Sequence, residues 1–406
     1  MEILFNAFFE GPVRDIFRLM FAYWFVWMPI ALASIAWEMW VTYVRTNWLA
    51  NSPRTLLEIK IPQEIAKGPQ AMEVVLNAIH SAGGGNMKMR YWHGLVPTWY
   101  SLEIASINGK VHFYVNTQRF FKNLLESQIY GQYTEAEIAE VDDYTKVLPK
   151  DLPNNDWSVW GAEFDLTKDD AYPIKTYIDY ELHLVKEEEE KVDPLSSILE
   201  FMGTLREGEQ LWFQILIKGA GGEWHEKGNK FVEKLLGRKK FQPGADTGRP
   251  PMMFSSGEDM VVKSIERCIA KHGFYTGIRF VYVAKKDVFS PSTFSGMIGM
   301  LKQFSSLNLN GFKPAWSTGV NYFFVKRMEY FKKKKIVRDF RARSYFYPPY
   351  RSFTNLNSPF GGQVKQFILN TEELATIYHY PGRTAEVPTL PRIEARKGEP
   401  PANLPI

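Results

Sequence analysis

The chain carries LMFAYWFVWMPIALASIAWEMWVTYV between Leu19 and Val44, and no charged residue occurs from Leu19 to Trp37. At a rise of about 1.5 Å per residue, a helix of this length crosses a hydrocarbon core of about 30 Å. Aromatic residues crowd both ends, where amphipathic rings settle at the membrane–water boundary. The stretch therefore predicts a transmembrane helix at 19–44. Its predicted interfacial tryptophans are Trp24, Trp27, Trp37 and Trp40.

A secretory signal and a buried core helix fit this apolar stretch less well than a spanning helix does. A secretory signal has a basic start, but residues 1–18 carry three acids against two arginines. A buried core helix is the second alternative, yet this stretch is apolar on every face. A hairpin that enters the membrane and returns stays open, because Pro29 lies mid-span. We expect residues 1–18 to lie along the membrane interface.

Charge and cysteine content indicate the orientation. Four basic residues follow the span within a short distance, at Arg45, Arg54, Lys60 and Lys67, so the positive-inside rule places the bulk of the chain in the cytoplasm. A single cysteine, Cys268, cannot form an internal disulfide, which agrees with a reducing compartment. We therefore expect a single-pass protein of the cytoplasmic (inner) membrane. The net charge of +4 is too small to indicate nucleic-acid binding by itself.

Residues 56–147 show the alternation of strands and helices expected of a small α+β domain. Asn108-Gly109 joins two of the predicted strands and suits a tight hairpin turn. The order is βαββαβ, which predicts a ferredoxin-like domain. The strands are predicted at 56–61, 100–107, 110–116 and 136–141, the helices at 69–79 and 117–130, and a flexible connection at 81–86.

Residues 148–325 predict a second α+β unit that resembles the first. It opens with LPKDLPNND (148–156), which has the composition of a linker, and the apolar strand at 210–217 is expected to be buried on both faces. Residues 219–257 are predicted to be an insertion. The fold class is thus α+β, with a transmembrane helix, two tandem ferredoxin-like domains and an extended C-terminal connector. The other elements are a predicted hairpin at 159–166 and 176–185, helices at 194 onward, 223–236, 260–271 and 290–304, and a strand at 275–283.

A basic helix laced with aromatic residues is predicted at 326–350. Nine Lys or Arg and two acids occur between Lys326 and Arg343. Such a helix suits phosphates of nucleic acid or anionic lipid headgroups, and its plain alternative is a solvated helix. The candidate contact residues are Lys332, Lys333, Lys334, Lys335, Arg338, Arg341 and Arg343.

Sequence motifs of enzyme chemistry are absent. No G-x-x-x-x-G-K-[ST] motif occurs, and the Gly-Lys pair at 109–110 lies in the predicted hairpin. The seven histidines form no metal-ligand spacing. Glycines at 219–222 follow a strand and precede a helix, but they lack the rest of a dinucleotide fingerprint, so a plain turn is favoured over a nucleotide site. We predict no catalytic residue, no cofactor and no metal.

Four stretches resemble a known family. IPQEIAKGPQAMEVVLNAIH (61–80), FFKNLLESQIYGQY (120–133), QVKQFILNTEELATIYHYPG (363–382) and ARKGEPPANLPI (395–406) are similar to the membrane-anchored region that precedes the motor in bacterial type IV secretion and conjugation-type ATPases of the HerA/FtsK-like group. The resemblance implies that 363–406 is a strand, a short helix capped by Thr371 and a proline-rich lead-in to an ATPase. The candidate ATPase-docking residues are Glu372, Glu373, Tyr378, His379, Pro400 and Pro401.

The resemblance implies a platform rather than a motor, because the P-loop that would follow the lead-in in the relatives does not occur in this chain. We expect a membrane-anchored, non-catalytic component of a DNA or protein translocation machine. Its expected partners are membrane lipid, an ATPase motor in cis or in trans, and further copies of itself. The alternative is a membrane-tethered nucleic-acid-binding module that uses residues 326–343.

Overall fold

The structure is a computed structural model that describes residues 19, 21–62, 67–81, 83, 85–180, 193–235, 256–319, 325–347 and 366–382. Several sequence predictions lie outside the described residues. These are the interfacial segment 1–18, the end of the predicted hairpin at 181–185, most of the predicted insertion at 236–255, and the connector after residue 382 with Pro400 and Pro401.

The chain divides into two compact units. The first contains Met1–Asn51, Gly84–Val96 and Pro349–Arg351, and the second contains the rest of the chain. In the first unit, α3 (Trp24–Ala50) is a helix of 27 residues with Pro29 inside it. The helix is long and apolar enough to cross a membrane. It continues six residues past the predicted end at Val44, because no helix-breaking residue occurs before Asn51-Ser52-Pro53.

The first unit also contains a short helix that the sequence did not reveal. α5 (Met87–Tyr91) follows Asn86, whose side chain accepts a hydrogen bond from the backbone N–H of Met89 at 2.9 Å. Asn at this position satisfies a helix N–H group that would otherwise lack a partner. A five-residue helix carries too little periodicity for recognition from sequence. Residues 84–96 therefore belong with α3 rather than with the predicted domain 56–147.

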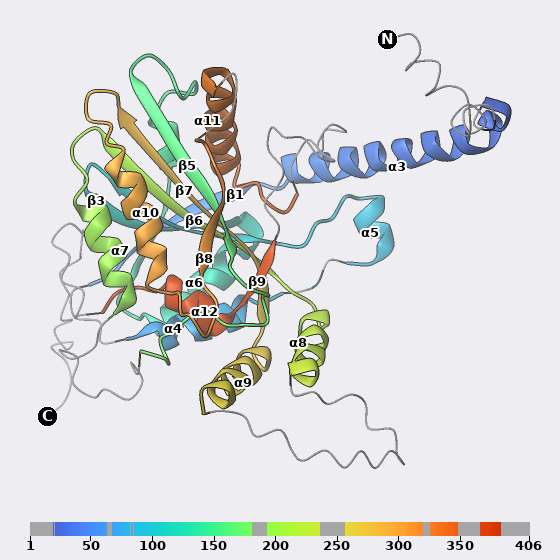
Figure 1. The fold of residues 1–406 in the computed structure, drawn as a ribbon. Helices are drawn as coiled ribbons and strands as arrows, with labels where there is room; N and C mark the ends of the chain where they lie inside the picture. The colour runs from blue at the N-terminus through green and yellow to red at the C-terminus, as the bar shows by residue number, and fades with distance from the viewer. Residues whose placement is uncertain are drawn as a thin grey trace, which may run out of the picture. The chain divides into compact units, whose positions relative to one another are not determined.

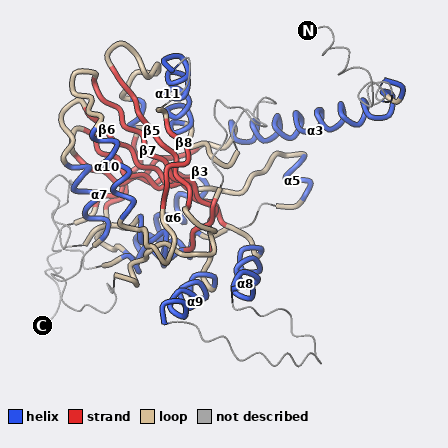
Figure 2. The backbone as a smooth tube through the Cα atoms, viewed as in Figure 1, coloured by secondary structure: helices blue, strands red, loops and turns tan. Residues whose placement is uncertain are grey.

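The second unit is built on one large antiparallel sheet (Figures 1 and 2). Among the described residues the strand order is β4-β1-β3-β2-β6-β7-β5-β8, and β9 pairs with β7 beside this path. The fold is therefore mixed α+β. The strands are β1 (Arg54–Lys60), β2 (Tyr100–Ile107), β3 (Lys110–Gln118), β4 (Glu137–Val141), β5 (Trp157–Leu166), β6 (Glu209–Gly219), β7 (Gly273–Lys285), β8 (Phe312–Ser317) and β9 (Phe367–Asn370).

The sheet repeats one pattern twice. Its first half runs β1-α4-β2-β3-α6-β4 along the chain and has the spatial order β4-β1-β3-β2. Its second half contains β5, α7, β6, β7, α10 and β8, and has the matching order β8-β5-β7-β6. The halves meet where β2 pairs with β6 over eight residue pairs. This pairing leaves neither half with an open edge at the centre.

Helices cover both faces of this sheet. One face carries α4 (Pro69–Ile79), α6 (Lys122–Gln132), α7 (Pro194–Gly203), α10 (Ser292–Lys302) and α12 (Thr371–Ile377), and its core includes Ile104, Phe213 and Phe280. The opposite face carries α11 (Val325–Arg341), whose Ile336 and Phe340 pack in a core with Trp212. Two further helices, α8 (Glu223–Leu235) and α9 (Ser256–Ile269), lie between β6 and β7 in the chain.

Some predicted elements differ from the observed ones. β3 continues to Gln118, and α6 begins at Lys122 rather than at residue 117, because the chain keeps pairing with β1 as far as Arg54. The predicted strand 176–185 is wrong over its described part, because Thr176 and Asp179 form a turn. The backbone N–H of Asp179 donates to the backbone carbonyl of Thr176, and the backbone N–H of Thr176 donates to the Asp179 carboxylate. β8 and the short 3-10 turn at Arg119–Phe121 were not predicted.

The segment 366–382 is part of the folded unit. β9 pairs with β7 from Gly273 to Thr276, and α12 follows it at once. The helix is capped by Asn370, not by Thr371 as predicted. Asn370 and Glu373 form a reciprocal capping box. Each residue from Phe367 to Pro381 is buried, so this segment completes the core rather than leading out of it.

Candidate functional site

The apolar surface of α3 is the first candidate site. Its side chains are exposed over most of its length, and only 6% of its most apolar stretch is buried. The four predicted interfacial tryptophans all lie on this exposed surface: Trp24, Trp27, Trp37 and Trp40. An exposed apolar surface of this extent calls for a nonpolar environment.

The basic helix α11 is the second candidate site. Its inner side packs on the sheet through Ile336, Val337 and Phe340. Lys334 and Arg338 are exposed, as predicted for a contact surface. The other candidates are half-buried or buried, and each is engaged within the chain: Lys332 with the Ser317 carbonyl, Lys333 with Glu329, Lys335 over the Trp316 ring, and Arg341 and Arg343 with loop carbonyls and carboxylates.

Arg341 and Arg343 have structural partners. Arg341 donates to the backbone carbonyls of Thr145, Pro149 and Lys150, so it holds the loop after β4 against the end of α11. A guanidinium has five N–H donors in a rigid fork, which suits several carbonyls at once. The side chain of Arg341 is thus occupied by this loop.

Arg343 is buried in a network of charges on the sheet. Its Nε lies 3.0 Å from Glu103 Oε1, and its Nη1 pairs with Asp143. Burial acts to lower the pKa of Arg343, but the carboxylates of Glu103 and Asp143 outweigh it and raise that pKa. The side chain of Arg343 is therefore enclosed and paired in this structure and offers no exposed surface to nucleic acid or lipid, so its predicted contact stays a prediction.

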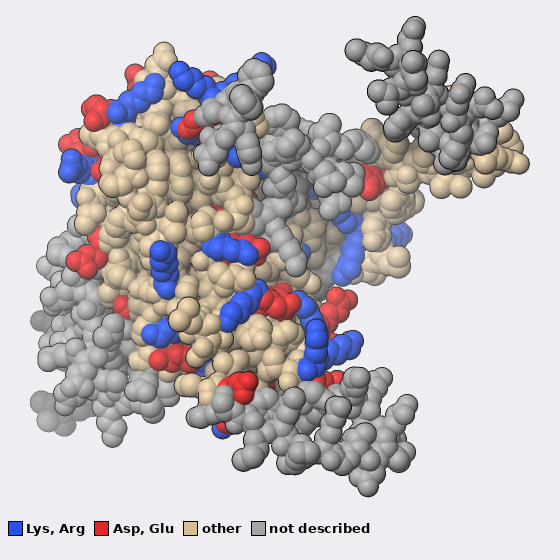
Figure 3. All heavy atoms as spheres, viewed as in Figure 1, with Lys and Arg blue, Asp and Glu red and all other residues tan. Residues whose placement is uncertain are grey.

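A basic hollow opens beside the first turns of α11. It is lined by four lysines, two asparagines and two aromatic residues among others: Lys286, Lys326, Lys333, Lys334, Asn154, Asn155, Trp157 and Tyr330. Lys333 is paired with Glu329 at 2.6 Å, and Lys334 lies 3.7 Å from Asp151. Lysine and arginine side chains gather at the top of the view in Figure 3, where α11 lies in Figure 1. Asp151 and Glu329 also line the hollow, so its four lysines exceed its acids by two.

Sequence reasoning missed part of this hollow. Lys286 follows β7, Asn154 lies in the loop before β5, and Trp157 is the first residue of β5, all far from α11 in the sequence. Asn154 Oδ1 accepts from the backbone N–H groups of Asp156 and Trp157, which fixes the loop. The linker composition of 148–156 predicted a loop at this place, but no local pattern placed it beside the basic helix.

The described candidates for ATPase docking are all buried. Glu372, Glu373, Tyr378 and His379 each expose 1% or less of their surface. His379 pairs with Asp193, the N-cap of α7, at 3.1 Å, and the Tyr378 hydroxyl donates to the backbone carbonyl of Tyr114. These four side chains therefore hold α12 in the fold and offer no exposed surface to a partner in this structure.

Glu372 is the buried member of a charge cluster between α12, α4 and α9, whose cations Arg267 and Lys271 are partly exposed. Its two carboxylate oxygens lie 3.1 Å from Arg267 and 2.9 Å from Lys271. Lys271 also pairs with Glu73 of α4 at 2.6 Å, and Glu73 accepts a hydrogen bond from the Tyr177 hydroxyl. Burial acts to lower the pKa of Lys271, and its two carboxylate partners raise it above the usual value. The cluster joins three helices through paired charges.

Glu373 is buried, and no ion pair to it occurs among the described residues. Burial raises its pKa to about 8, although the backbone N–H groups of Asn370 and Ile174 donate to its two oxygens and favour the charged form. A carboxyl group with this environment titrates near neutral pH. We therefore expect the stability of the segment 366–382 to depend on pH through Glu373.

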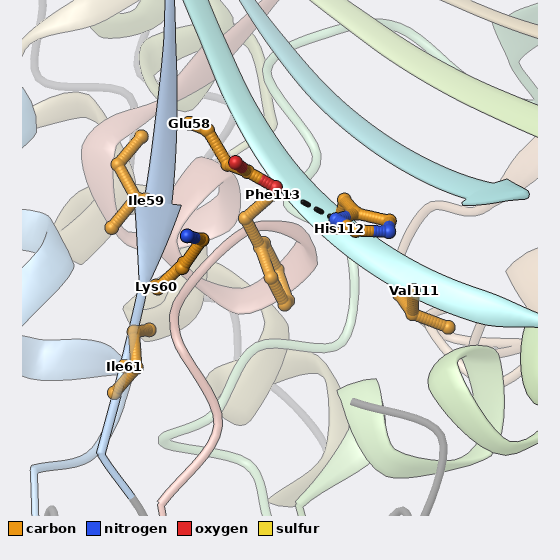
Figure 4. Close-up of a pocket in the computed structure, with 7 residues that line it drawn as sticks. All are labelled: Glu58, Ile59, Lys60, Ile61, Val111, His112 and Phe113. Carbon is orange, nitrogen blue, oxygen red and sulfur yellow. Dashed lines mark hydrogen bonds and ion pairs between the residues drawn. The ribbon is translucent and has the colours of Figure 1, made fainter. Parts of the chain in front are cut away.

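Glu58 and His112 form a pair across β1 and β3, with Glu58 Oε1 2.7 Å from His112 Nδ1 (Figure 4). The hydrogen bond from His112 lowers the pKa of Glu58. The cavity beside them measures about 10 Å³, which accommodates a single water molecule and no organic ligand. The arrangement lacks the room for a substrate.

Metal-binding and nucleophilic groups are sparse in the described part of the chain. No group of three or more His, Cys, Asp or Glu side chains there has the arrangement of a metal site. Cys268 is buried, and burial raises the pKa of its thiol well above the usual value, which keeps it unreactive.

The chain belongs to a protein family described as a domain of unknown function (DUF8128), whose model matches residues 45–390. The match includes every described strand and begins inside α3, so it leaves out most of the apolar helix. No curated protein matches the chain.

Proposed function

We propose that the chain is a membrane-anchored, non-catalytic platform of a DNA or protein translocation machine of the type IV secretion or conjugation kind. In this proposal α3 crosses the cytoplasmic membrane once, and the second unit lies in the cytoplasm, where it positions or oligomerises an ATPase motor. The observation that carries the proposal is the exposed apolar surface of α3. Only Asn51, Ser52 and Pro53 separate that helix from β1 of the large folded unit.

We further propose that the two halves of the sheet are tandem ferredoxin-like domains. Each half has four strands in the order 4-1-3-2, which supports this assignment. In both halves a helix follows the first strand and another precedes the fourth strand, and the second half has α8 and α9 in addition, between β6 and β7. The pairing of β2 with β6 joins the halves into one continuous sheet rather than two independent modules. One continuous sheet suits a protein that holds other components in place.

The burial of 366–382 specifies how a motor would be attached. A motor linked in cis after the lead-in would be joined to a chain that is clamped by β9, α12 and the charge cluster around Glu372. Movements of the motor would then be transmitted to the sheet through β7. A motor that binds in trans would use surfaces other than the buried side chains of α12.

The experiment that tests the platform is extraction of the native protein from its membranes, followed by its mass in detergent and by identification of bound proteins. The proposal expects an integral membrane protein, assembly into a homo-oligomer, and a co-purifying or covalently linked P-loop ATPase. Release from the membrane by high salt alone would contradict the anchor. A monomer with no ATPase, in cis or in trans, would contradict the platform.

A membrane-tethered nucleic-acid-binding module is the second candidate function, and the basic hollow beside α11 favours it. When lysines contact phosphates, the binding constant falls as the salt concentration rises. In a plot of the logarithm of the binding constant against the logarithm of the salt concentration, each contact to a single strand contributes about −0.7 to the slope. The test is the double variant Lys286→Gln/Lys326→Gln, measured by DNA binding across a salt series. Lys302→Gln/Lys313→Gln is the matched control, because these lysines are also exposed and lie outside the hollow. Equal salt slopes for the two variants would exclude the hollow as the binding site.

A further inference from the structure

The loop that contains α5 exposes an unusual set of side chains. Met87, Met89 and Trp92 are 76%, 46% and 58% exposed, and Lys88 and Arg90 are exposed between them. Single exposed apolar residues are ordinary, but three large ones within six residues form a patch. Apolar side chains interleaved with cations are typical of segments that lie at the surface of a membrane.

This loop is docked on α3 by an aromatic cluster. The Trp40 indole donates to the backbone carbonyl of Tyr91 at 3.0 Å. The Trp37 ring lies 5.6 Å from the ring of Tyr91 and 6.4 Å from that of Trp92, and the Trp40 ring lies 5.9 Å from Trp92. Four aromatic residues therefore gather at the point where the uncharged run of α3 ends.

Gly94 brings the loop backbone into direct contact with α3. Its φ is +71°, and a Cβ at this position would lie 2.1 Å from the backbone carbonyl oxygen of Val44. Only glycine permits both the left-handed conformation and this approach. The loop is thus fixed along α3 between Trp37 and Val44 by the backbone as well as by its rings.

We propose that the α5 loop, residues 85–96, is a second membrane contact that lies in the headgroup region of the bilayer beside the cytoplasmic end of α3. Met87, Met89 and Trp92 contact the boundary of the acyl chains, and Lys88 and Arg90 contact the phosphates of anionic lipids. This inference rests on the proposed membrane anchor.

Three observations favour a lipid surface over a protein partner for this loop. The loop belongs to the same compact unit as α3, whose exposed surface already needs an apolar environment. Its tryptophan and tyrosine rings join those of Trp37 and Trp40 in one belt, as is usual at a membrane interface. Its cations suit the negative cytoplasmic leaflet, where basic residues next to a span are attracted to anionic headgroups.

The test uses the full chain in nanodiscs of phosphatidylcholine and phosphatidylglycerol, with a nitroxide label at one introduced cysteine. Cys268 is buried and leaves the background unlabelled. The three positions are Met89→Cys on α5, Leu32→Cys in the middle of α3, and Val74→Cys on α4 as a control with the same 46% exposure as Met89. Collisions with oxygen report the lipid phase, and collisions with a water-soluble nickel chelate report the aqueous phase.

We expect the Leu32 label in the lipid phase, the Met89 label at the interface with nickel collisions several-fold fewer than at Val74, and the Val74 label in water. Nickel collisions at Met89 equal to those at Val74, with Leu32 in lipid, would overturn this inference and leave the anchor standing. A Leu32 label in water would instead overturn the anchor itself. A Met89 label shielded from both reagents would show that protein, not lipid, covers the loop.

A charge variant tests the contact with lipid phosphates separately from the contact with the acyl chains. Lys88→Glu is expected to increase nickel collisions at the Met89 label several-fold in the mixed lipid, and Lys302→Glu, on the second unit, is the matched control. If the Met89 variant folds poorly, Met87→Cys, which is more exposed, provides the same readout. No difference between Lys88→Glu and Lys302→Glu would contradict the contact with lipid phosphates.

Discussion

α11 and α12 are two charged helices that the sequence predicted as contact surfaces, yet they have opposite environments. α11 has eight Lys or Arg in seventeen residues and keeps Lys334 and Arg338 on its outer side. α12 carries Glu372 and Glu373, and all seven of its residues are buried. The difference teaches that charge in a sequence does not reveal exposure, because an acidic side chain is buried where the fold supplies polar partners for it. Arg267 and Lys271 are those partners for Glu372, and the backbone N–H groups of Asn370 and Ile174 are those for Glu373.

The largest expected effect concerns the residue at which the basic stretch enters the core. Arg343→Leu leaves Glu103 buried without its cation, so we expect the free energy of unfolding to fall by about 3–5 kcal/mol. Arg338→Leu is the control, because Arg338 is 69% exposed and is expected to change stability by at most about 0.5 kcal/mol. Urea unfolding followed by tryptophan fluorescence measures both. Equal effects at the two positions would mean that Arg343 is not enclosed.

The second expected effect tests whether the charges of α12 hold it in place. Glu372→Gln removes one of the two acidic partners of Arg267 and one of the two acidic partners of Lys271, and we expect a loss of about 2–3 kcal/mol in unfolding free energy. The control is Glu200→Gln, an exposed acid of α7. Protease cleavage after Arg267 or Lys271 would rise in the same variant. Unchanged stability would show that the cluster around Glu372 contributes nothing net.

The third expected effect is a dependence of stability on pH. The folded pKa of Glu373 is about 8, above the value of 4.5 for an unperturbed glutamate. The folded state therefore binds more protons than the unfolded state between these values. This contribution to stability is fully present below about pH 4.5 and is lost as pH rises through about 8, with a slope of at most about 1.4 kcal/mol per pH unit.

Glu373→Gln cannot titrate, so this slope is expected to disappear in the variant while its stability at low pH falls, because an amide nitrogen cannot accept from the backbone N–H of Asn370 or Ile174. Unfolding curves at a series of pH values measure the slope. An identical slope in the wild-type chain and the variant would assign the titration to another group.

The smallest expected effect is on the outer side of α11. Lys334→Gln/Arg338→Gln removes two exposed cations whose ion pairs are with exposed or neighbouring acids, so stability is expected to change by at most about 0.5 kcal/mol. Binding of polyanions at low salt is expected to weaken in the same variant, in contrast to stability. A loss of stability like that of Arg343→Leu would remove the distinction between the two sides of the helix.

The sequence by itself determined the elements with strong local patterns. The uncharged run at 19–37 predicted α3, Asn108-Gly109 predicted the hairpin of β2 and β3, and the apolar run at 210–217 predicted a strand buried on both faces. These features depend on periodicity, length and turn chemistry, which are properties of neighbouring residues. The α+β class followed from their order.

Only the tertiary structure decided which surfaces are available. Pairing of β2 with β6 joined the two halves into one sheet, and pairing of β9 with β7 placed the glutamates of α12 in the core. The basic hollow is lined by residues that are far apart in the chain, and the contact of the α5 loop with α3 is likewise made by residues that are far apart in the chain. The physical reason is that burial of a charge depends on partners brought together by long-range packing, whereas a helix or a turn depends on its own residues.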